Sequence, residues 1–107
     1  MNMGIIDDRE EALEKEYIMK LERSFHIKAR RDRMLARWAA DLIGRKDFDV
    51  YFNEIISASL LEPGEENVFN KVFDDLQYAD VAIDANAVRE KMKQLLREAA
   101  SSLNGVA

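Results

Sequence analysis

The sequence predicts an all-α protein, a four-helix bundle that carries a mobile N-terminal arm able to form a helix. Three observations predict this class. Apolar residues recur at helical spacing, glycine and proline are scarce at 4 and 1 of 107 residues, and short polar connections separate the periodic segments. Such short connections favour antiparallel neighbours in a bundle. A chain of 107 residues suffices for one domain with one core.

The first periodic segment is expected from about Asp7 to Ile43. Asp7 and Glu10 have the spacing of an acidic capping box, and Gly44 stands where a helix ends on a left-handed residue. From His26 to Arg33 polar residues interrupt the apolar stripe, and we expect contact with the body to stop there. The apolar positions on either side of the interruption are Leu13, Tyr17, Leu21 and Phe25, then Met34, Leu35, Trp38, Ala39, Leu42 and Ile43.

Three more helices are expected over about 47–61, 65–77 and 84–104. Asp47 and Asp84 are expected to cap the first and last of them, and Glu65 and Glu66 suit the positive end of the middle one. The turn-forming pairs 63–64 and 104–105 end two of the helices. The expected buried faces comprise Phe48, Tyr51, Phe52, Ile55 and Ile56, then Val68, Phe69, Val72, Phe73 and Leu76, and finally Val88, Met92, Leu95, Leu96, Ala99, Ala100 and Leu103.

The segment before His26 has an apolar stripe only about one side chain wide, so an isolated helix there would be marginal in water. In one interpretation the stripe packs along the protein's own bundle as an overhanging first helix. In the other it is a recognition arm, partly disordered when free, that folds as a helix in a partner's groove. The polar interruption favours the second interpretation. We therefore expect an arm, residues 1–25, and a four-helix body, residues 26–107.

The net charge of −5 conceals a basic middle, because residues 24–46 carry 7 bases and 2 acids. A helical adaptor or nucleic-acid-binding module that uses the stretch Lys28–Arg37 is therefore an alternative function. Nucleic-acid-binding domains are usually basic as a whole, however, and a solvated helix face explains the stretch more simply.

Several classes of chemistry lack the residues that they need. There is no cysteine, and His26 is the one histidine, so we expect a surface or hinge histidine and no metal site. The four glycines are scattered singly and form no phosphate loop. We expect no enzyme and no cofactor. The sequence has no apolar run that could cross a membrane and no signal peptide, so we expect a cytoplasmic protein.

Four ordered motif blocks suggest a family. They are residues 6–14 (IDDREEALE), 28–31 followed by 38–40 (KARR and WAA), 65–72 with 75–76 (EENVFNKV and DL), and 88–92 (VREKM). With these blocks the chain resembles the alphaproteobacterial zeta subunits of the F1FO-ATP synthase from about Ile6 to Ala99. The ordered set of blocks is far more specific than any one of them.

The resemblance implies a regulatory subunit that inhibits ATP hydrolysis. Its N-terminal helix would insert into F1 between the catalytic subunits and the rotor, and F1 would be its partner. The free protein would be a monomer that binds no nucleic acid and reaches the membrane only through the ATP synthase. Family members often carry phenylalanine where Ile6 and Leu13 stand here, which implies a weaker anchor. The partner-binding residues implied are Asp7, Asp8, Arg9, Glu10, Ala12, Leu13, Glu14 and Tyr17.

Overall fold

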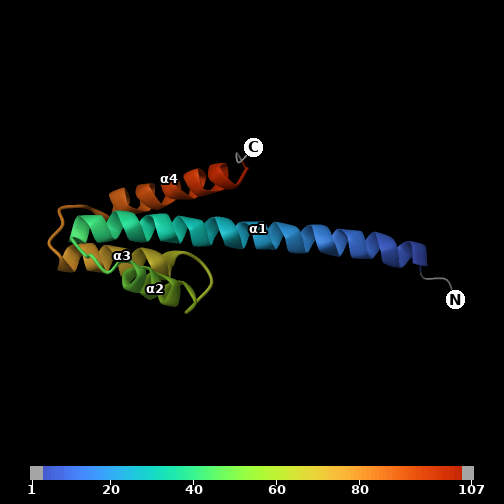
Figure 1. Cartoon of the computed structure of the whole chain (residues 1–107), viewed down its shortest axis with the longest axis horizontal. Helices are drawn as coiled ribbons and strands as arrows, with labels where there is room; N and C mark the ends of the chain where they lie inside the picture. The colour runs from blue at the N-terminus through green and yellow to red at the C-terminus, as the bar shows by residue number, and fades with distance from the viewer. Residues whose placement is uncertain (1–3, 105–107) are drawn as a thin grey trace.

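The computed structural model describes residues 4–104 and confirms the all-α class (Figure 1). Within that range the chain forms four helices: α1 (Gly4–Ile43), α2 (Phe48–Ser59), α3 (Glu66–Tyr78) and α4 (Ala85–Asn104). Each bound lies within a few residues of the position expected from the periodicity. None of the helices in this range is long and apolar enough to cross a membrane.

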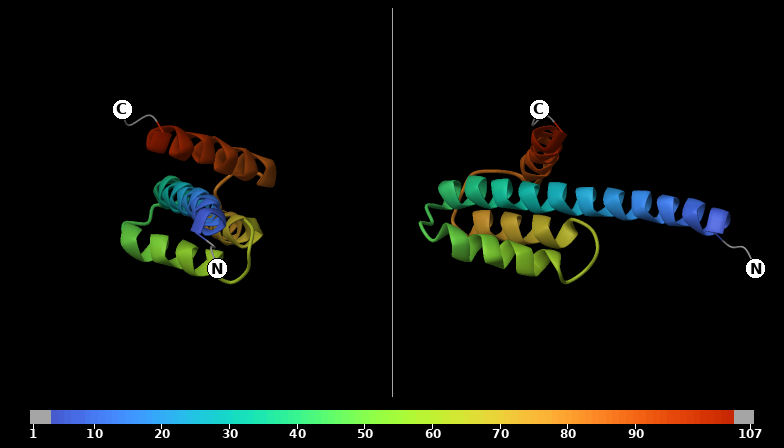
Figure 2. Two further views of the ribbon diagram at one scale, coloured as in Figure 1. Left: turned by 90° about the vertical axis from the view of Figure 1, so that its right-hand side faces the viewer. Right: turned by 45° about the vertical axis from the view of Figure 1, so that its right-hand side comes forward.

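The 40-residue helix α1 is the central element of the fold. It contacts each of the other three helices, with α2 and α3 on one side and α4 crossing on the other (Figure 2). Among the first three helices, successive ones run antiparallel, as the short connections predict (Figure 1), whereas α4 crosses the others at a steep angle (Figure 2). The N-terminal half of α1 extends beyond the other helices, and the molecule measures 68 × 33 × 26 Å.

One core joins the C-terminal half of α1 to the other helices. Leu35, Ala36 and Ala39 of α1 are fully buried against residues of α2, α3 and α4. The expected apolar faces are confirmed in their centres, while residues at their edges, such as Phe52 and Phe73, are partly buried. The expected burial of Leu103 is wrong, and Leu42 is exposed as well, because both lie at helix ends beyond the cover of the core. The remaining core residues are Ala40, Phe48, Tyr51, Ile55, Val68, Phe69, Val72, Leu76, Val88, Met92 and Leu95.

Two of the expected helix ends are confirmed. Gly44 has a φ of 84°, and the N–H groups of Gly44 and Arg45 both donate to the carbonyl of Ala40, which closes α1 with a left-handed residue. Asp84 caps α4, because its Oδ1 accepts a hydrogen bond of 2.8 Å from the backbone N–H of Ala87. The expected end at Asn104-Gly105 lies partly outside the described residues.

Two expected caps are wrong. The helix α1 begins at Gly4, so Asp7 lies inside the helix and the capping box with Glu10 does not mark its start. Asp47 precedes α2 without a side-chain capping bond, because its carboxylate is engaged by Arg45 instead. For Asp47 the competing partner is Arg45, two residues away, which the capping pattern did not reveal.

Candidate functional site

The N-terminal half of α1 has no covering from the rest of the molecule. Every residue from Asp8 to His26 is exposed, and the body begins to cover the helix at Ile27. The stripe residues Leu13, Tyr17, Leu21 and Phe25 are 52% to 67% exposed. The interpretation in which this stripe packs on the protein's own bundle is therefore wrong. We call residues 8–25, the part of the expected segment 1–25 whose side chains the structure describes, the arm.

The arm's stripe continues the buried face of α1. Successive steps of four residues advance by only about 40° around a helix, so the stripe winds slowly along one side. Phe25, Asp32, Ala36 and Ala39 follow at intervals of seven, four and three residues, which places them on the same side. The face that meets the body from Asp32 onward is therefore the face left uncovered in the arm.

The structure brings only part of the expected partner-binding set together. Leu13, Glu14 and Tyr17 line one surface depression with Ile18, and helical spacing places Glu10 on the same side. Asp8 and Ala12 lie on the opposite side of the helix, and Arg9 lies between the two sides. The side chain of Asp7 lies outside the described residues. A partner that contacts the whole set must therefore surround the helix.

Body contact stops between His26 and Ile27, within the expected interval from His26 to Arg33, but two polar residues of that interval are buried as an ion pair. Arg31 and Asp32 are only 2% and 5% exposed. Nε of Arg31 donates to Oδ1 of Asp32 at 2.8 Å, and Nη1 donates to Oε1 of Glu65 at 3.0 Å. Burial raises the pKa of Asp32, although the hydrogen bond from Arg31 opposes this shift. His26 is exposed, as expected for a surface histidine.

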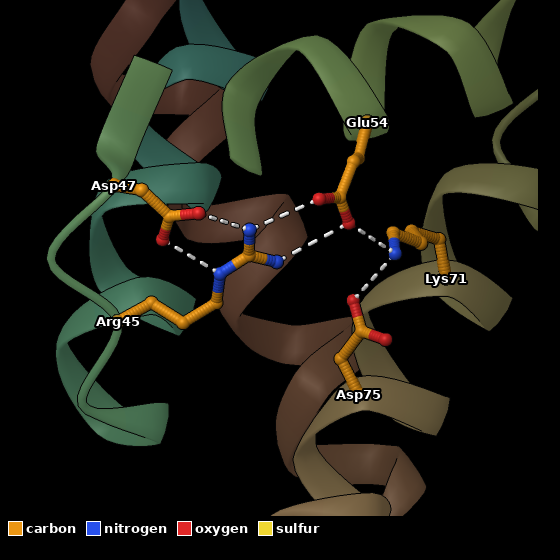
Figure 3. Close-up of polar contacts among 5 residues, drawn as sticks. All are labelled: Arg45, Asp47, Glu54, Lys71 and Asp75. Carbon is orange, nitrogen blue, oxygen red and sulfur yellow. Dashed lines mark hydrogen bonds and ion pairs between the residues drawn. The ribbon is translucent and has the colours of Figure 1, made fainter. Parts of the chain in front are cut away.

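A second polar cluster holds the far end of α1 to α2 and α3 (Figure 3). The guanidinium of Arg45 donates to Asp47 at 2.9 and 2.6 Å and to Glu54 at 3.2 and 3.0 Å. Lys71 donates to Glu54 at 2.8 Å and lies 3.0 Å from Asp75. Each acidic group of the cluster faces a cation, so its geometry is that of a structural clamp.

The electrostatics of this clamp agree with a structural role. Hydrogen bonds from Arg45 and Lys71 lower the pKa of Glu54, and the bond from Arg45 lowers the pKa of Asp47. Both carboxylates are thus held ionised, the reverse of what a general acid at neutral pH needs. Among the described residues no group of acidic residues and histidine could hold a metal ion.

The basic stretch Lys28–Arg37 is divided by burial, because Arg31 is buried whereas Arg30, Arg33 and Arg37 are exposed and line one depression. The guanidinium of Arg31 is buried in its ion pair with Asp32. Arg33 and Arg37 lie over the ring of Phe48, with the guanidinium carbon 5.1 and 3.8 Å from the ring centroid. These contacts give the arginines a packing role in the body. The solvated face expected here is confirmed for Lys28, Arg30, Arg33 and Arg37, which are exposed, but is wrong for Arg31.

Comparison with known protein families distinguishes the ATPase-inhibitor interpretation from the adaptor or nucleic-acid-binding interpretation. A family model described as ATPase inhibitor subunit zeta matches residues 3–102, which is nearly the whole chain. The chain belongs to the ATPase inhibitor subunit zeta family. A comparison with curated proteins gave no match.

Membership of the zeta family indicates an inhibitory, regulatory role and an association with ATP synthase. The matched residues 3–102 include the arm as well as the body, so the arm is part of the family's shared sequence. The resemblance drawn from the motif blocks is confirmed.

Two features of the site escaped the sequence patterns. The burial of Arg31 and Asp32 depends on Glu65, which is 34 residues away from Arg31, and no local periodicity reports such a contact. Leu60 and Leu61, at the end of α2, are 77% and 76% exposed. Two adjacent leucines ahead of a Pro-Gly turn are a signal that could have indicated a surface apolar patch.

Proposed function

We propose that this zeta-family protein inhibits ATP hydrolysis by inserting its arm, as a helix, into F1 at the interface between the catalytic subunits and the rotor. The single observation that carries the proposal is the arm itself. A run of residues without any covering from the body presents an apolar stripe at its own end of the molecule. A protein-binding helix must expose such a stripe before it meets its groove.

The dimensions of the arm support insertion. Residues 8–25 form a helical rod about 27 Å long and about 10–12 Å wide. The body around α1 is much broader and would remain outside a cleft that admits one helix. We propose the division at residues 1–25 and 26–107 on this ground, with the body as the part that stays outside.

The proposed contacts follow from the helix geometry. Leu13 and Tyr17 would supply most of the buried apolar area, with Glu10 and Glu14 beside them on the same side. Asp8, Arg9 and Ala12 would face the other wall of the cleft, and Asp7 completes the implied set. A cleft between catalytic subunit and rotor has walls on more than one side, which suits a helix contacted all around.

The arm gains little stability from its own structure. The Glu16–Lys20 pair, at 3.5 Å, is an exposed i,i+4 pair that contributes about 0.2–0.5 kcal/mol. We propose that the free arm exchanges between helix and less ordered states, and that the free protein is a monomer. Binding in a groove would then fix the helix and bury its stripe.

The test is ATP hydrolysis by F1 from the same cell, measured with the full chain present. We expect inhibition by the wild-type protein and its loss in Tyr17→Asp, because a carboxylate on the stripe would be buried without a partner. Tyr78→Asp is the matched control, since Tyr78 is exposed on the body at the end of α3.

The outcomes distinguish the inhibitory function of the chain from the role of the stripe. Inhibition by Tyr78→Asp but not by Tyr17→Asp supports the arm as the inhibitory element. Undiminished hydrolysis in the presence of the wild-type chain overturns the proposed function. Equal inhibition by both variants overturns the role of the stripe. Deletion of the residues before Met19 should reproduce the loss seen with Tyr17→Asp.

A further inference from the structure

The connection between α2 and α3 lies against α1 at the place where the arm leaves the body (Figure 2). A cavity of about 210 Å³ opens there. Its walls come from the base of the arm, the end of α2, the connection and the first turn of α3. The lining residues that matter are Phe25, Ala29, Ile56, Leu60, Pro63 and Val68. We call this cavity, with the adjacent Leu61, the corner.

The corner exposes more apolar surface than the fold requires. Leu60 and Leu61 are about three-quarters exposed and Phe25 is two-thirds exposed, although all three are large hydrophobic residues. Connections between helices are normally polar, and neighbouring exposed hydrophobic residues mark binding surfaces more often than scattered ones do. This exposed part of the side chains does not stabilise the body and is accessible to another molecule.

The corner is continuous with the stripe of the arm. Leu21 and Phe25 are the last stripe residues before the body, and Phe25 itself lines the cavity. A partner that contacts the stripe from Leu13 to Phe25 would therefore also reach Leu60, which lines the same cavity as Phe25. The connection between α2 and α3 lies beside α1 where its projecting half begins (Figure 1), so the corner adjoins the arm.

The charges around the corner indicate what fits it. The charged residues that line the cavity are two cations and three carboxylates, so its lining is weakly acidic: Lys28, Arg31, Asp32, Glu62 and Glu65. Arg31 is engaged by Asp32 and Glu65. The arm is also acidic, with 7 acids and 4 bases between Asp7 and Arg23. An apolar protrusion flanked by basic residues therefore complements both the cavity and its rim.

We infer that the docking surface extends beyond the arm, and that the corner receives an apolar, basic-flanked protrusion of the same ATPase that receives the arm. This inference rests on the proposed function. It assigns Leu60 and Leu61 to partner binding. The body would then contact the ATPase as well, in addition to the contact made by the arm. Two linked contacts raise affinity more than either would alone.

The test uses the full chain with Leu60→Ala/Leu61→Ala. Because both side chains are exposed, these changes should leave the thermal unfolding midpoint nearly unchanged. The dissociation constant for F1 should rise by about tenfold or more. Val50→Ala/Tyr78→Ala, which removes two exposed apolar side chains away from the corner, should bind like the wild type.

A second measurement locates the contact directly. A photoreactive phenylalanine derivative in place of Leu61 should cross-link to a subunit of F1, and the same group in place of Tyr78 should not. Wild-type affinity of the corner variant, together with no cross-link from position 61, overturns the inference. If Tyr17→Asp still abolishes inhibition in that case, the proposed function stands without the corner. A wild-type chain that neither binds nor inhibits F1 overturns both.

Discussion

Arg31 and Asp32 are adjacent in sequence and form a buried ion pair, with Nε and Oδ1 2.8 Å apart, at the point where the arm joins the body. Adjacent residues on a helix point about 100° apart, so both can be covered only where the body surrounds more than one side of the helix. The second bond of Arg31 reaches Glu65 just ahead of α3. The pair therefore fastens the base of the arm to the connection that forms the corner.

Replacing one member of this pair should be costly. We expect Arg31→Leu to lower the free energy of unfolding by about 3 kcal/mol, because it leaves a buried carboxylate without its cation. Urea denaturation followed by circular dichroism measures the loss. The double variant Arg31→Leu/Asp32→Leu should recover most of it, and a single variant as stable as the wild type would show that the pair is not truly desolvated.

The pH dependence of stability should reveal the burial of Asp32. Because burial raises its pKa above 3.8 in the folded state, the folded protein holds this proton at pH values where the unfolded chain has released it. Relative to Asp32→Asn, the wild type should therefore lose stability as the pH rises from 3.8 through the folded-state pKa. Urea titrations of both proteins across that range measure the difference, and a difference that grows in the opposite direction would contradict the assignment.

Glu54 should behave in the opposite way. Its pKa is lowered by Arg45 and Lys71, so its contribution is present above 4.5 and is lost as the pH falls through the folded-state value. Since Glu54 is partly exposed, we expect Glu54→Gln to cost about 1 kcal/mol or less at pH 7. At a pH below both values the two proteins should unfold at the same urea concentration.

Amide hydrogen exchange should divide α1 into two parts. Amides from Asp8 to Phe25 should exchange at least about a hundredfold faster than those from Leu35 to Ala40, because only the second group is covered by other helices. Addition of F1 should slow exchange in the arm. Equal protection along the whole helix in the free protein would show that the arm is stable without a partner.

The size of the arm's anchor residue should set the strength of inhibition. Leu13→Phe buries more area in a partner's groove, and we expect it to lower the concentration for half-inhibition of F1 by about threefold to tenfold. Val50→Phe, at an exposed position of α2, is the matched control and should leave that concentration unchanged. A lower inhibitory strength in Leu13→Phe would mean that the groove has no room beyond leucine.

The fold could be predicted from the sequence wherever one helix face had to be apolar. The buried set of α4, from Val88 through Met92 and Leu95 to Ala99, follows its periodicity directly. The capping bond of Asp84 could be predicted for the same reason, since its partner is three residues away. Such features depend on neighbours within one helix, and the sequence contains those neighbours in order.

The site was less accessible to prediction because its decisive contacts are long-range. Asp47 stands at the position of a helix cap, but its carboxylate accepts a hydrogen bond from Arg45 instead of from the backbone of α2. The same guanidinium also donates to Glu54. The polar residues at 31 and 32 suggested a break in contact, whereas pairing with each other and with Glu65 allows them to be buried. Exposure of Leu60 depends on where the connection runs, which no helical period describes.

One uninterrupted helix carries both the arm and the centre of the body. While it is helical, such a rod couples length to orientation, since each residue added to it moves the tip outward by about 1.5 Å and turns it by about 100°. Under the proposed insertion, the 40-residue α1 would therefore fix both the depth of the tip and the wall that Tyr17 faces, once the body has come to rest on the ATPase.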